Sequence, residues 1–306
     1  MVTANNRVVG DDYPYHIAFD MADQYRAKRI TELLENAHDL TVDDMKTMQA
    51  DVVTLPAKEF LPFLAEVTPQ NELEQRALAL VKSWDLRLDR DSQGGMIFEA
   101  FYWQLWSALF EDDLGLPLLE NYRRMGASQP GVLVAILNEE GNSFLDDQRT
   151  KDQVETRRDI VDSSFRKATL FLREKLGDNP DGWRWGKLHR MRFRHVPLGQ
   201  AGIAPLDWIF SSSDEPAAGG TFTNNQSMWD MATPFEVIFG SSQRMIVDFS
   251  DLSRSVAVNS TGQVAHPFHP HRDDQIALWR QVEYHPLIFT RAAAETYRES
   301  LLRLVP

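Results

Sequence analysis

Two adjacent side-chain amides near the start of the chain, Asn5 and Asn6, have the most readily interpreted chemistry. An Asn amide is an uncharged hydrogen-bond donor, and it can stabilise an oxygen that gains negative charge during acyl transfer. The segment that follows, Gly10-Asp11-Asp12-Tyr13-Pro14-Tyr15, has the composition of a tightly built loop. The alternative is that both amides bond only the backbone of their own loop, as Asn often does in turns.

Two arginines, Arg26 and Arg29, follow on a predicted helix over residues 22–35. Residues three apart on a helix are neighbours, so the two guanidinium groups should lie side by side. A solvated cationic face is the alternative interpretation, because helical arginines are usually exposed.

A second group of chemically active residues lies near the other end of the chain, between residues 266 and 274. Its imidazoles and carboxylates could bind zinc or another divalent ion. Pro267 and Pro270 should keep the segment stiff and extended, so the side chains need not converge on one point. We therefore expect a structural loop held by hydrogen bonds, with a metal site as the alternative. The residues concerned are His266, His269, His271, Asp273 and Asp274.

Composition excludes several classes of protein. The 306 residues are 43% apolar and 25% charged, which is typical of a globular protein. The net charge of −13 argues against nucleic acid and against an anionic membrane as partners. The absence of cysteine excludes disulfides, thiolate catalysis and cysteine-ligated zinc. No apolar run approaches the 18 or so residues that a membrane-spanning helix needs.

The order of the predicted elements indicates an α+β fold, with a helical first part followed by antiparallel strands. We expect two regions, 1–180 with the loop and most helices, and 181–306 with the strands and a closing helix, packed as one unit. Thr41 with Asp44 predicts a helix start, as does Pro56. Further helices are expected at 71–84, 96–110, 150–176 and 291–304. Strands are expected around 191–194 and at 219–223, 235–239, 243–249 and 254–259.

Several motifs, in order along the chain, resemble the penicillin acylase (penicillin amidase) family of N-terminal-nucleophile hydrolases. They begin with Ala4-Asn5-Asn6-Arg7, Gly10 to Tyr15, and Tyr25-Arg26-Ala27-Lys28-Arg29-Ile30. They resume in 185–190, 240–248 and 262–275. The resemblance implies an incomplete αββα sandwich, because the chain is similar only to the C-terminal portion of the family's β chain.

The resemblance also implies a mechanism and its residues. Family enzymes cleave an amide through an acyl-enzyme formed on a serine whose own α-amine is the base. Asn5 matches the oxyanion-hole amide, Arg26 an arginine that supports the active site, and Phe19 an aromatic of the acyl pocket. The chain begins Met1-Val2, so we expect the nucleophile, the α chain and the N-terminal part of the β chain to be supplied from elsewhere.

The expected function is therefore hydrolysis of a small N-acyl amide, of the β-lactam side-chain or acyl-homoserine-lactone type, with this chain inactive alone. No cofactor is needed for the chemistry. The resemblance allows a structural calcium ion, but none of Asp11, Asp12 and Asp20 matches a ligand, so no metal residue is assigned. It also implies a periplasmic or secreted location. The alternatives are a non-catalytic subunit that completes a split enzyme, and a histidine-ligated metal protein.

Overall fold

The computed structural model describes residues 1–19, 21–35, 37–124 and 129–305, and these residues form two compact units that interleave along the chain. Unit 1 consists of Met1–Asn36, Asp51–Arg192 and Ser213–Gly240. Unit 2 consists of Ala37–Ala50, Phe193–Ser212 and Ser241–Pro306. These two units are groups of residues in mutual contact, and they are not a test of the predicted division into 1–180 and 181–306. That division stays a sequence-based prediction.

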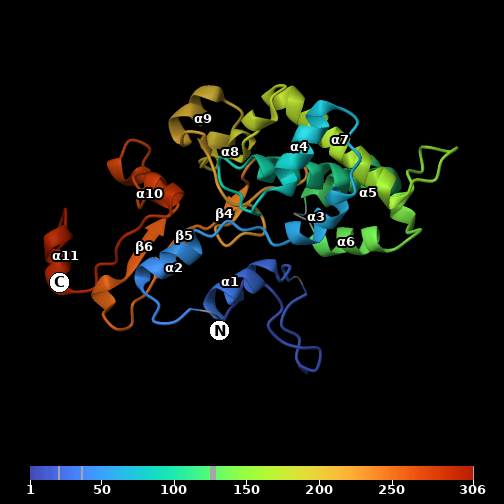
Figure 1. Cartoon of the computed structure of the whole chain (residues 1–306). Coiled ribbons are helices and arrows are strands. Elements are labelled where there is room, and N and C mark those ends of the chain that lie inside the picture. The colour runs from blue at the N-terminus through green and yellow to red at the C-terminus, as the bar shows by residue number, and fades with distance from the viewer. Residues whose placement is uncertain (20, 36, 125–128, 306) are drawn as a thin grey trace. The chain divides into compact units, whose positions relative to one another are not determined.

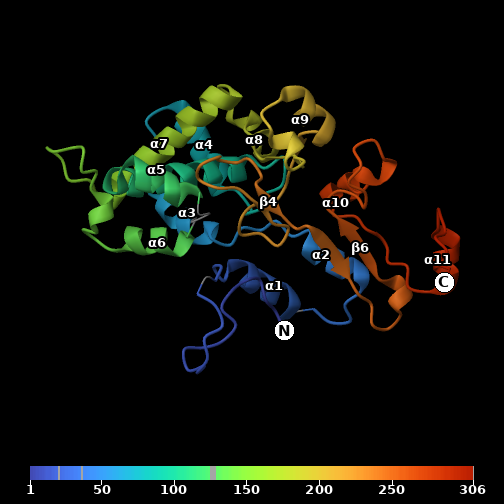
Figure 2. The same ribbon diagram turned by 180° about the vertical axis from the view of Figure 1, so that it is seen from behind.

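Unit 1 has a helical core. The long helix α5 lies beside α7, and Figures 1 and 2 show the two from opposite sides. Phe101 and Trp106 of α5 and Phe165 of α7 are fully buried, as expected for a helix that is apolar on nearly every side. The helices of this unit are α1 (Tyr25–Glu35), α3 (Ala57–Ala65), α4 (Glu72–Lys82), α5 (Gln93–Arg124), α6 (Pro130–Asn138), α7 (Arg157–Leu176) and α8 (Trp185–Leu188).

Local signals in the sequence set several helix boundaries. Asn71 caps α4, and Thr156 forms a capping box with Asp159 at the start of α7. Gly177, with φ 92°, ends α7 in a conformation that costs glycine little. The expected helix at 150–176 therefore begins later, at Arg157. The expected helix at 96–110 is longer than predicted and is broken at Gly115, where φ is 65°.

The strands of unit 1 are short. β1 (Arg190–Met191) pairs antiparallel with β2 (Glu215–Pro216), and β3 (Ser227–Met228) pairs with β4 (Phe239–Gly240). The strand expected at 219–223 is wrong. Gly219 adopts φ 84°, and the Thr223 hydroxyl bonds the carbonyl groups of Gly220 and Asn225, so the segment turns.

Unit 2 contains a three-stranded antiparallel sheet in the order β5 (Gln243–Ile246), β6 (Val256–Asn259) and β7 (His285–Pro286). Its helices are α2 (Val42–Gln49), α9 (Ala204–Phe210), α10 (Ile276–Gln281) and α11 (Arg291–Tyr297). Thr41 and Asp44 form the predicted capping box of α2, and Thr290 caps α11. The closing helix ends at Tyr297, before the predicted residue 304.

The observed order, helices first and small antiparallel sheets later, confirms the predicted fold class. Among the described residues, no helix is both long enough and apolar enough to cross a membrane.

Candidate functional site

The backbone around Asn5 is held in an unusual conformation. Asn5 adopts φ 63°, a left-handed conformation that Asn tolerates better than most residues. Its carbonyl oxygen accepts a hydrogen bond from the Ala22 amide at 2.9 Å, so the loop closes on the residues just before α1. Asn6 Oδ1 accepts from the Ala4 amide at 3.0 Å. Asn6 therefore serves the loop backbone, as the alternative interpretation expects, whereas the side chain of Asn5 does not.

Arg26, in the first turn of α1, contacts the Asn5 side chain directly. Its Nη2 donates to Asn5 Oδ1 and to the Ala4 carbonyl oxygen, each at 2.9 Å. A guanidinium can only donate, so the partner atom on Asn5 must be the amide oxygen. The Asn5 NH2 group then points away from Arg26, and within the described part of the chain it has no hydrogen-bond acceptor. The amide is thus oriented as a free donor.

The electrostatic character of this site comes from Arg26. Its side chain is half-buried, and this burial lowers the pKa of the guanidinium. Because an arginine remains protonated under all ordinary conditions, the site keeps a positive charge next to the Asn5 amide. Asp23 lies just before α1, and burial and the Glu59 carboxylate raise the pKa of its carboxyl group.

An open hollow of about 500 Å³ lies beside the loop, lined by Arg7 and by residues of 9–24. Phe19 is one of its lining residues and is 98% exposed, with its ring 4.0 Å from that of His16. Tyr13 and Tyr15, also in the lining, meet edge to face at 5.9 Å. The hollow is therefore accessible, and both aromatic and polar side chains line it.

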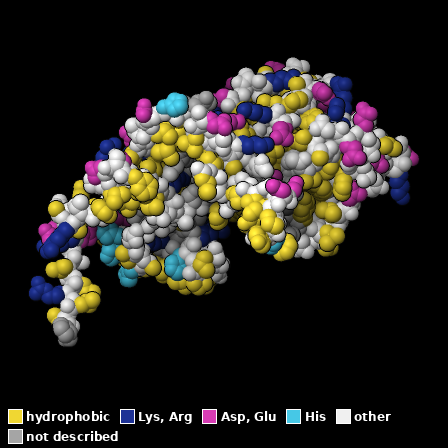
Figure 3. Space-filling view, turned by 90° about the horizontal axis from the view of Figure 1, so that it is seen from below, with side chains coloured by type: hydrophobic (Ala, Val, Ile, Leu, Met, Phe, Trp, Pro, Cys, Tyr) yellow, Lys and Arg dark blue, Asp and Glu magenta, His cyan; other side chains and the backbone are white. Residues whose placement is uncertain are grey.

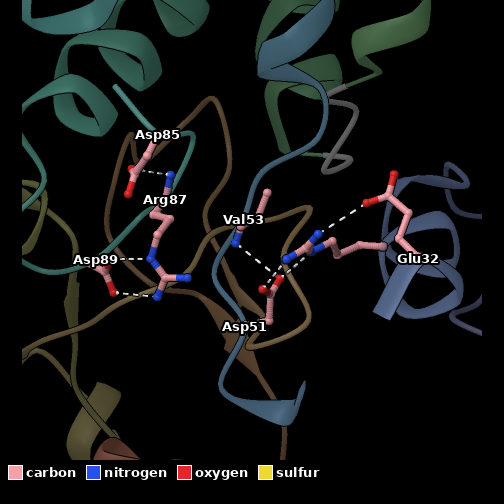
Figure 4. Close-up of polar contacts among 7 residues, drawn as sticks. Glu32, Asp51, Val53, Asp85, Arg87 and Asp89 are labelled. Carbon is pink, nitrogen blue, oxygen red and sulfur yellow. Dashed lines mark hydrogen bonds and ion pairs between the residues drawn. The ribbon is translucent and has the colours of Figure 1, made fainter. Parts of the chain in front are cut away.

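Arg29 is not part of a solvated cationic face. Its side chain is 20% exposed and grips the Asp51 carboxylate with two hydrogen bonds, Nε to Oδ1 at 3.0 Å and Nη2 to Oδ2 at 2.8 Å. Figure 4 shows Asp51 with the contacts that its carboxylate accepts, and Glu32 and Val53 nearby. Sequence reasoning missed Asp51, since nothing in the spacing of residues 29 and 51 links them.

The described residues do not form the calcium site or the histidine-ligated metal site considered from the sequence. Among the described residues, no group of three or more histidine, aspartate or glutamate side chains could hold an ion. Asp11 pairs with Arg7, and Asp20 lies outside the described residues. In the histidine-rich stretch, His271 bonds Asp274 at 2.7 Å and Glu299 at 2.9 Å, through its two ring nitrogens. Both carboxylates raise the pKa of His271. His266 Nδ1 accepts from the Phe268 amide. Hydrogen bonds hold this loop.

Two buried titratable residues were also missed. Glu99 of α5 is 6% exposed, and desolvation raises the pKa of its carboxyl to about 8. His189 is fully buried, stacked on Trp185 at 4.2 Å, and desolvation lowers its pKa to about 3. A carboxylate in an otherwise apolar helix is the one signal that could have identified Glu99.

Comparison with known structures gives the fold. The whole chain superposes on 56% of a thermostable penicillin G acylase from Alcaligenes faecalis, with a TM-score of 0.56 and 14% identity. The sequence gives the family: residues 1–296 match penicillin amidase, and the chain belongs to the penicillin amidase family. Named members of this family are amide hydrolases.

Curated relatives are similar over nearly the whole chain. It is 30% identical to the penicillin acylase 2 proenzyme of a Pseudomonas species over 96% of its length. It is 25% identical to the acyl-homoserine lactone acylase QuiP of Pseudomonas aeruginosa over 92%. It covers only 37% and 36% of these two relatives, so it spans little more than a third of their length.

Proposed function

We propose that this chain is the C-terminal part of an amidohydrolase that cleaves a small N-acyl amide through an acyl-enzyme. Its contribution to the active site is Asn5 as the oxyanion donor, with Arg26 as the residue that orients it. The observation that supports this proposal most strongly is the hydrogen bond from Arg26 Nη2 to Asn5 Oδ1, which leaves the Asn5 NH2 group free to donate.

The proposed chemistry assigns each group one task. A serine supplied by residues outside this sequence attacks the amide carbonyl carbon, and the carbonyl oxygen becomes an oxyanion. Asn5 Nδ2 donates to that oxygen, and the Arg26 charge favours it electrostatically. The α-amine of that serine takes the hydroxyl proton during the attack and gives it to the leaving nitrogen as the C–N bond breaks, and water then hydrolyses the acyl ester. Removing one oxyanion donor typically raises such a barrier by about 2.7–4 kcal/mol.

The acyl group is proposed to occupy the hollow that Phe19 lines. The aromatic side chains of its lining suit an apolar acyl chain, and the names of the relatives suggest two substrate classes, β-lactams with an acyl side chain and acyl-homoserine lactones. We propose the same periplasmic or secreted setting that the family resemblance implies. We propose that a structural calcium ion of the full-length enzyme draws some of its ligands from the part of the enzyme that this sequence lacks.

The decisive experiment compares the 306-residue chain with the assembled enzyme. We expect no hydrolysis of a phenylacetyl or longer-acyl 4-nitroanilide by the purified chain, because the proposal takes the serine nucleophile and its free α-amine from residues outside this sequence. Co-expression with the polypeptide encoded immediately upstream should produce activity that the Asn5→Gly variant lacks. Turnover by the chain alone would overturn the assignment of the nucleophile, and full activity of Asn5→Gly would overturn the role of Asn5.

A second function, a non-catalytic subunit that completes a split enzyme, is favoured by the exposed apolar surface. Figure 3 shows several groups of hydrophobic side chains on one face of the molecule. Large apolar groups left in water are typical of surfaces that a partner covers. Co-purification with an upstream-encoded protein that gains no amidase activity would support this function. Exposed aromatic side chains among the described residues include Tyr15, Phe19, Trp208, Phe249 and Phe268.

A further inference from the structure

We propose that Arg29 and Asp51 form a positioning pair that fixes helix α1 so that Arg26 can hold the Asn5 amide. The inference rests on the proposed function for its catalytic meaning, but its geometry stands without it. Neither residue reaches the Asn5 amide, so both act through the helix.

The first step is the geometry of the pair. Arg29 Nε and Nη2 each reach one oxygen of Asp51, which gives the two-point contact that fixes both distance and orientation. The Asp51 carboxylate is 7% exposed, and its Oδ1 also accepts from the Val53 amide at 3.3 Å. Arg29 therefore binds a buried carboxylate that the Val53 amide also holds in place.

The second step is the rigidity of the segment that carries Asp51. The Asp51 carbonyl oxygen accepts from the Asn225 amide at 2.9 Å. The Val52 carbonyl oxygen accepts from the Leu88 amide, and the Thr54 amide donates to the Leu86 carbonyl oxygen, each at 3.0 Å. These backbone hydrogen bonds join Asp51 and its neighbours to other segments of unit 1. The Arg29–Asp51 pair therefore connects α1 to those segments.

The third step is the small number of other side chains that attach α1 to unit 1. Only Tyr25 and Ala27 of this helix are buried, and the Tyr25 ring meets that of Phe222 edge to face at 5.8 Å. The chain between α1 and Asp51 includes residues 37–50, which belong to unit 2 and therefore do not hold α1 on unit 1. Arg26 and Arg29 are one turn apart, so a rotation of α1 released by loss of the Asp51 contact would also move the Arg26 guanidinium.

The chain offers a matched control in the same view. Arg87 also grips a carboxylate with two hydrogen bonds, to Asp89, at 2.8 Å and 3.3 Å (Figure 4). This second pair is 40% and 54% exposed, and its members are two residues apart on one segment. Its side chains join two residues of one segment, and Arg87→Lys keeps both the charge that attracts Asp51 and the backbone bridge to Val53, so this variant tests the loss of a two-point ion pair without releasing α1.

The experiment compares Arg29→Lys and Asp51→Asn with Arg87→Lys in the purified 306-residue chain. Lysine keeps the charge but loses the two-point grip. The readouts are the side-chain NH2 resonance of Asn5 in protein with 15N-labelled asparagine, assigned by its loss in Asn5→Gly, and hydrogen exchange at Arg26 Nη2, the atom that donates to Asn5 and Ala4. We expect Arg29→Lys to shift the Asn5 resonance and to speed Arg26 exchange about tenfold or more, with Arg87→Lys changing neither.

An unchanged Asn5 resonance in folded Arg29→Lys would overturn the proposal, as would an equal shift in Arg87→Lys. If Asp51→Asn does not fold, Arg29→Lys still tests the proposal. Lysine keeps a positive charge beside the buried Asp51 carboxylate. In the co-expressed enzyme we expect Arg29→Lys to lower kcat with little change in KM. A shifted resonance in an enzyme indifferent to Asn5→Gly would refute the proposed function and leave the positioning pair intact.

Discussion

The indole N–H of Trp229 donates to Glu99 Oε2 at 3.1 Å, and both side chains are buried in unit 1. This single donor does not offset the cost of removing a carboxylate from water, so the pKa of Glu99 stays raised at about 8. The protonated carboxyl is the stable form at neutral pH.

The raised pKa of Glu99 makes stability fall at alkaline pH. The unfolded chain releases this proton near the ordinary pKa of 4.5, whereas the folded chain keeps it until about 8. The contribution is therefore complete below about 4.5 and is lost as the pH rises through 8, by about 3–5 kcal/mol in total. Glu99→Gln keeps an acceptor for Trp229 and should remove this loss. Denaturant titrations at pH 5 and pH 9 measure it, and parallel pH dependence in both proteins would contradict the prediction.

His189 should have the opposite effect at acid pH. Its folded pKa, about 3, lies below the ordinary 6.5, so its contribution is present above 6.5 and is lost as the pH falls toward 3. Its Nδ1 contacts the Phe235 carbonyl oxygen at 2.8 Å, so an Asn amide can take over that contact. We expect His189→Asn to cost about 1–3 kcal/mol at pH 7, because it leaves a small cavity. It should also reduce the loss of stability between pH 6.5 and 4. An unaltered acid slope in urea titrations would disprove the assignment.

Asn5 can be tested with two substitutions that separate conformation from chemistry. Because φ is 63°, Asn5→Gly should fold with stability close to that of the parent, whereas Asn5→Ala should lose about 1 kcal/mol more. Both remove the amide donor, so in the co-expressed enzyme both should lower kcat about 100- to 1000-fold. Thermal unfolding and single-turnover kinetics give the two quantities. A large activity difference between Gly and Ala would show that backbone shape, and not the amide, matters.

Phe19 should influence the binding of substrate and not the stability of the folded chain. Its side chain is 98% exposed, so Phe19→Ala should change the free energy of unfolding by less than about 0.5 kcal/mol. In the co-expressed enzyme it should raise KM for apolar acyl groups by about tenfold, with a smaller effect on an acetyl substrate. Val8→Ala, also at an exposed apolar position, provides the matched control. Equal effects of both variants, or of Phe19→Ala on all acyl lengths, would contradict an acyl-pocket role.

Helix ends that depend on short-range interactions were the part of the fold that could be predicted from sequence. The capping box at Thr41 and the stop at Gly177 depend on residues only a few positions apart, so their signals lie within one helical turn. The box that Thr156 forms with Asp159 carries the same kind of signal, but the sequence-based prediction missed it and began this helix at about residue 150. The short strands were predicted less well. The expected strand at 219–223 is a turn, because the Thr223 hydroxyl competes for backbone groups that a strand would have used.

For the candidate site, the sequence by itself determined the residue types: an amide at position 5, a guanidinium at 26 and an aromatic ring at 19. Family membership followed from motifs in order along the chain. Only the tertiary structure decided which amide is free, since Asn6 bonds its own loop and Asn5 is oriented by Arg26, 21 residues away. It alone connected Arg29 to Asp51 and buried Glu99 beside Trp229. The physical reason is that hydrogen-bond orientation and desolvation depend on distance in space, which the linear sequence does not record.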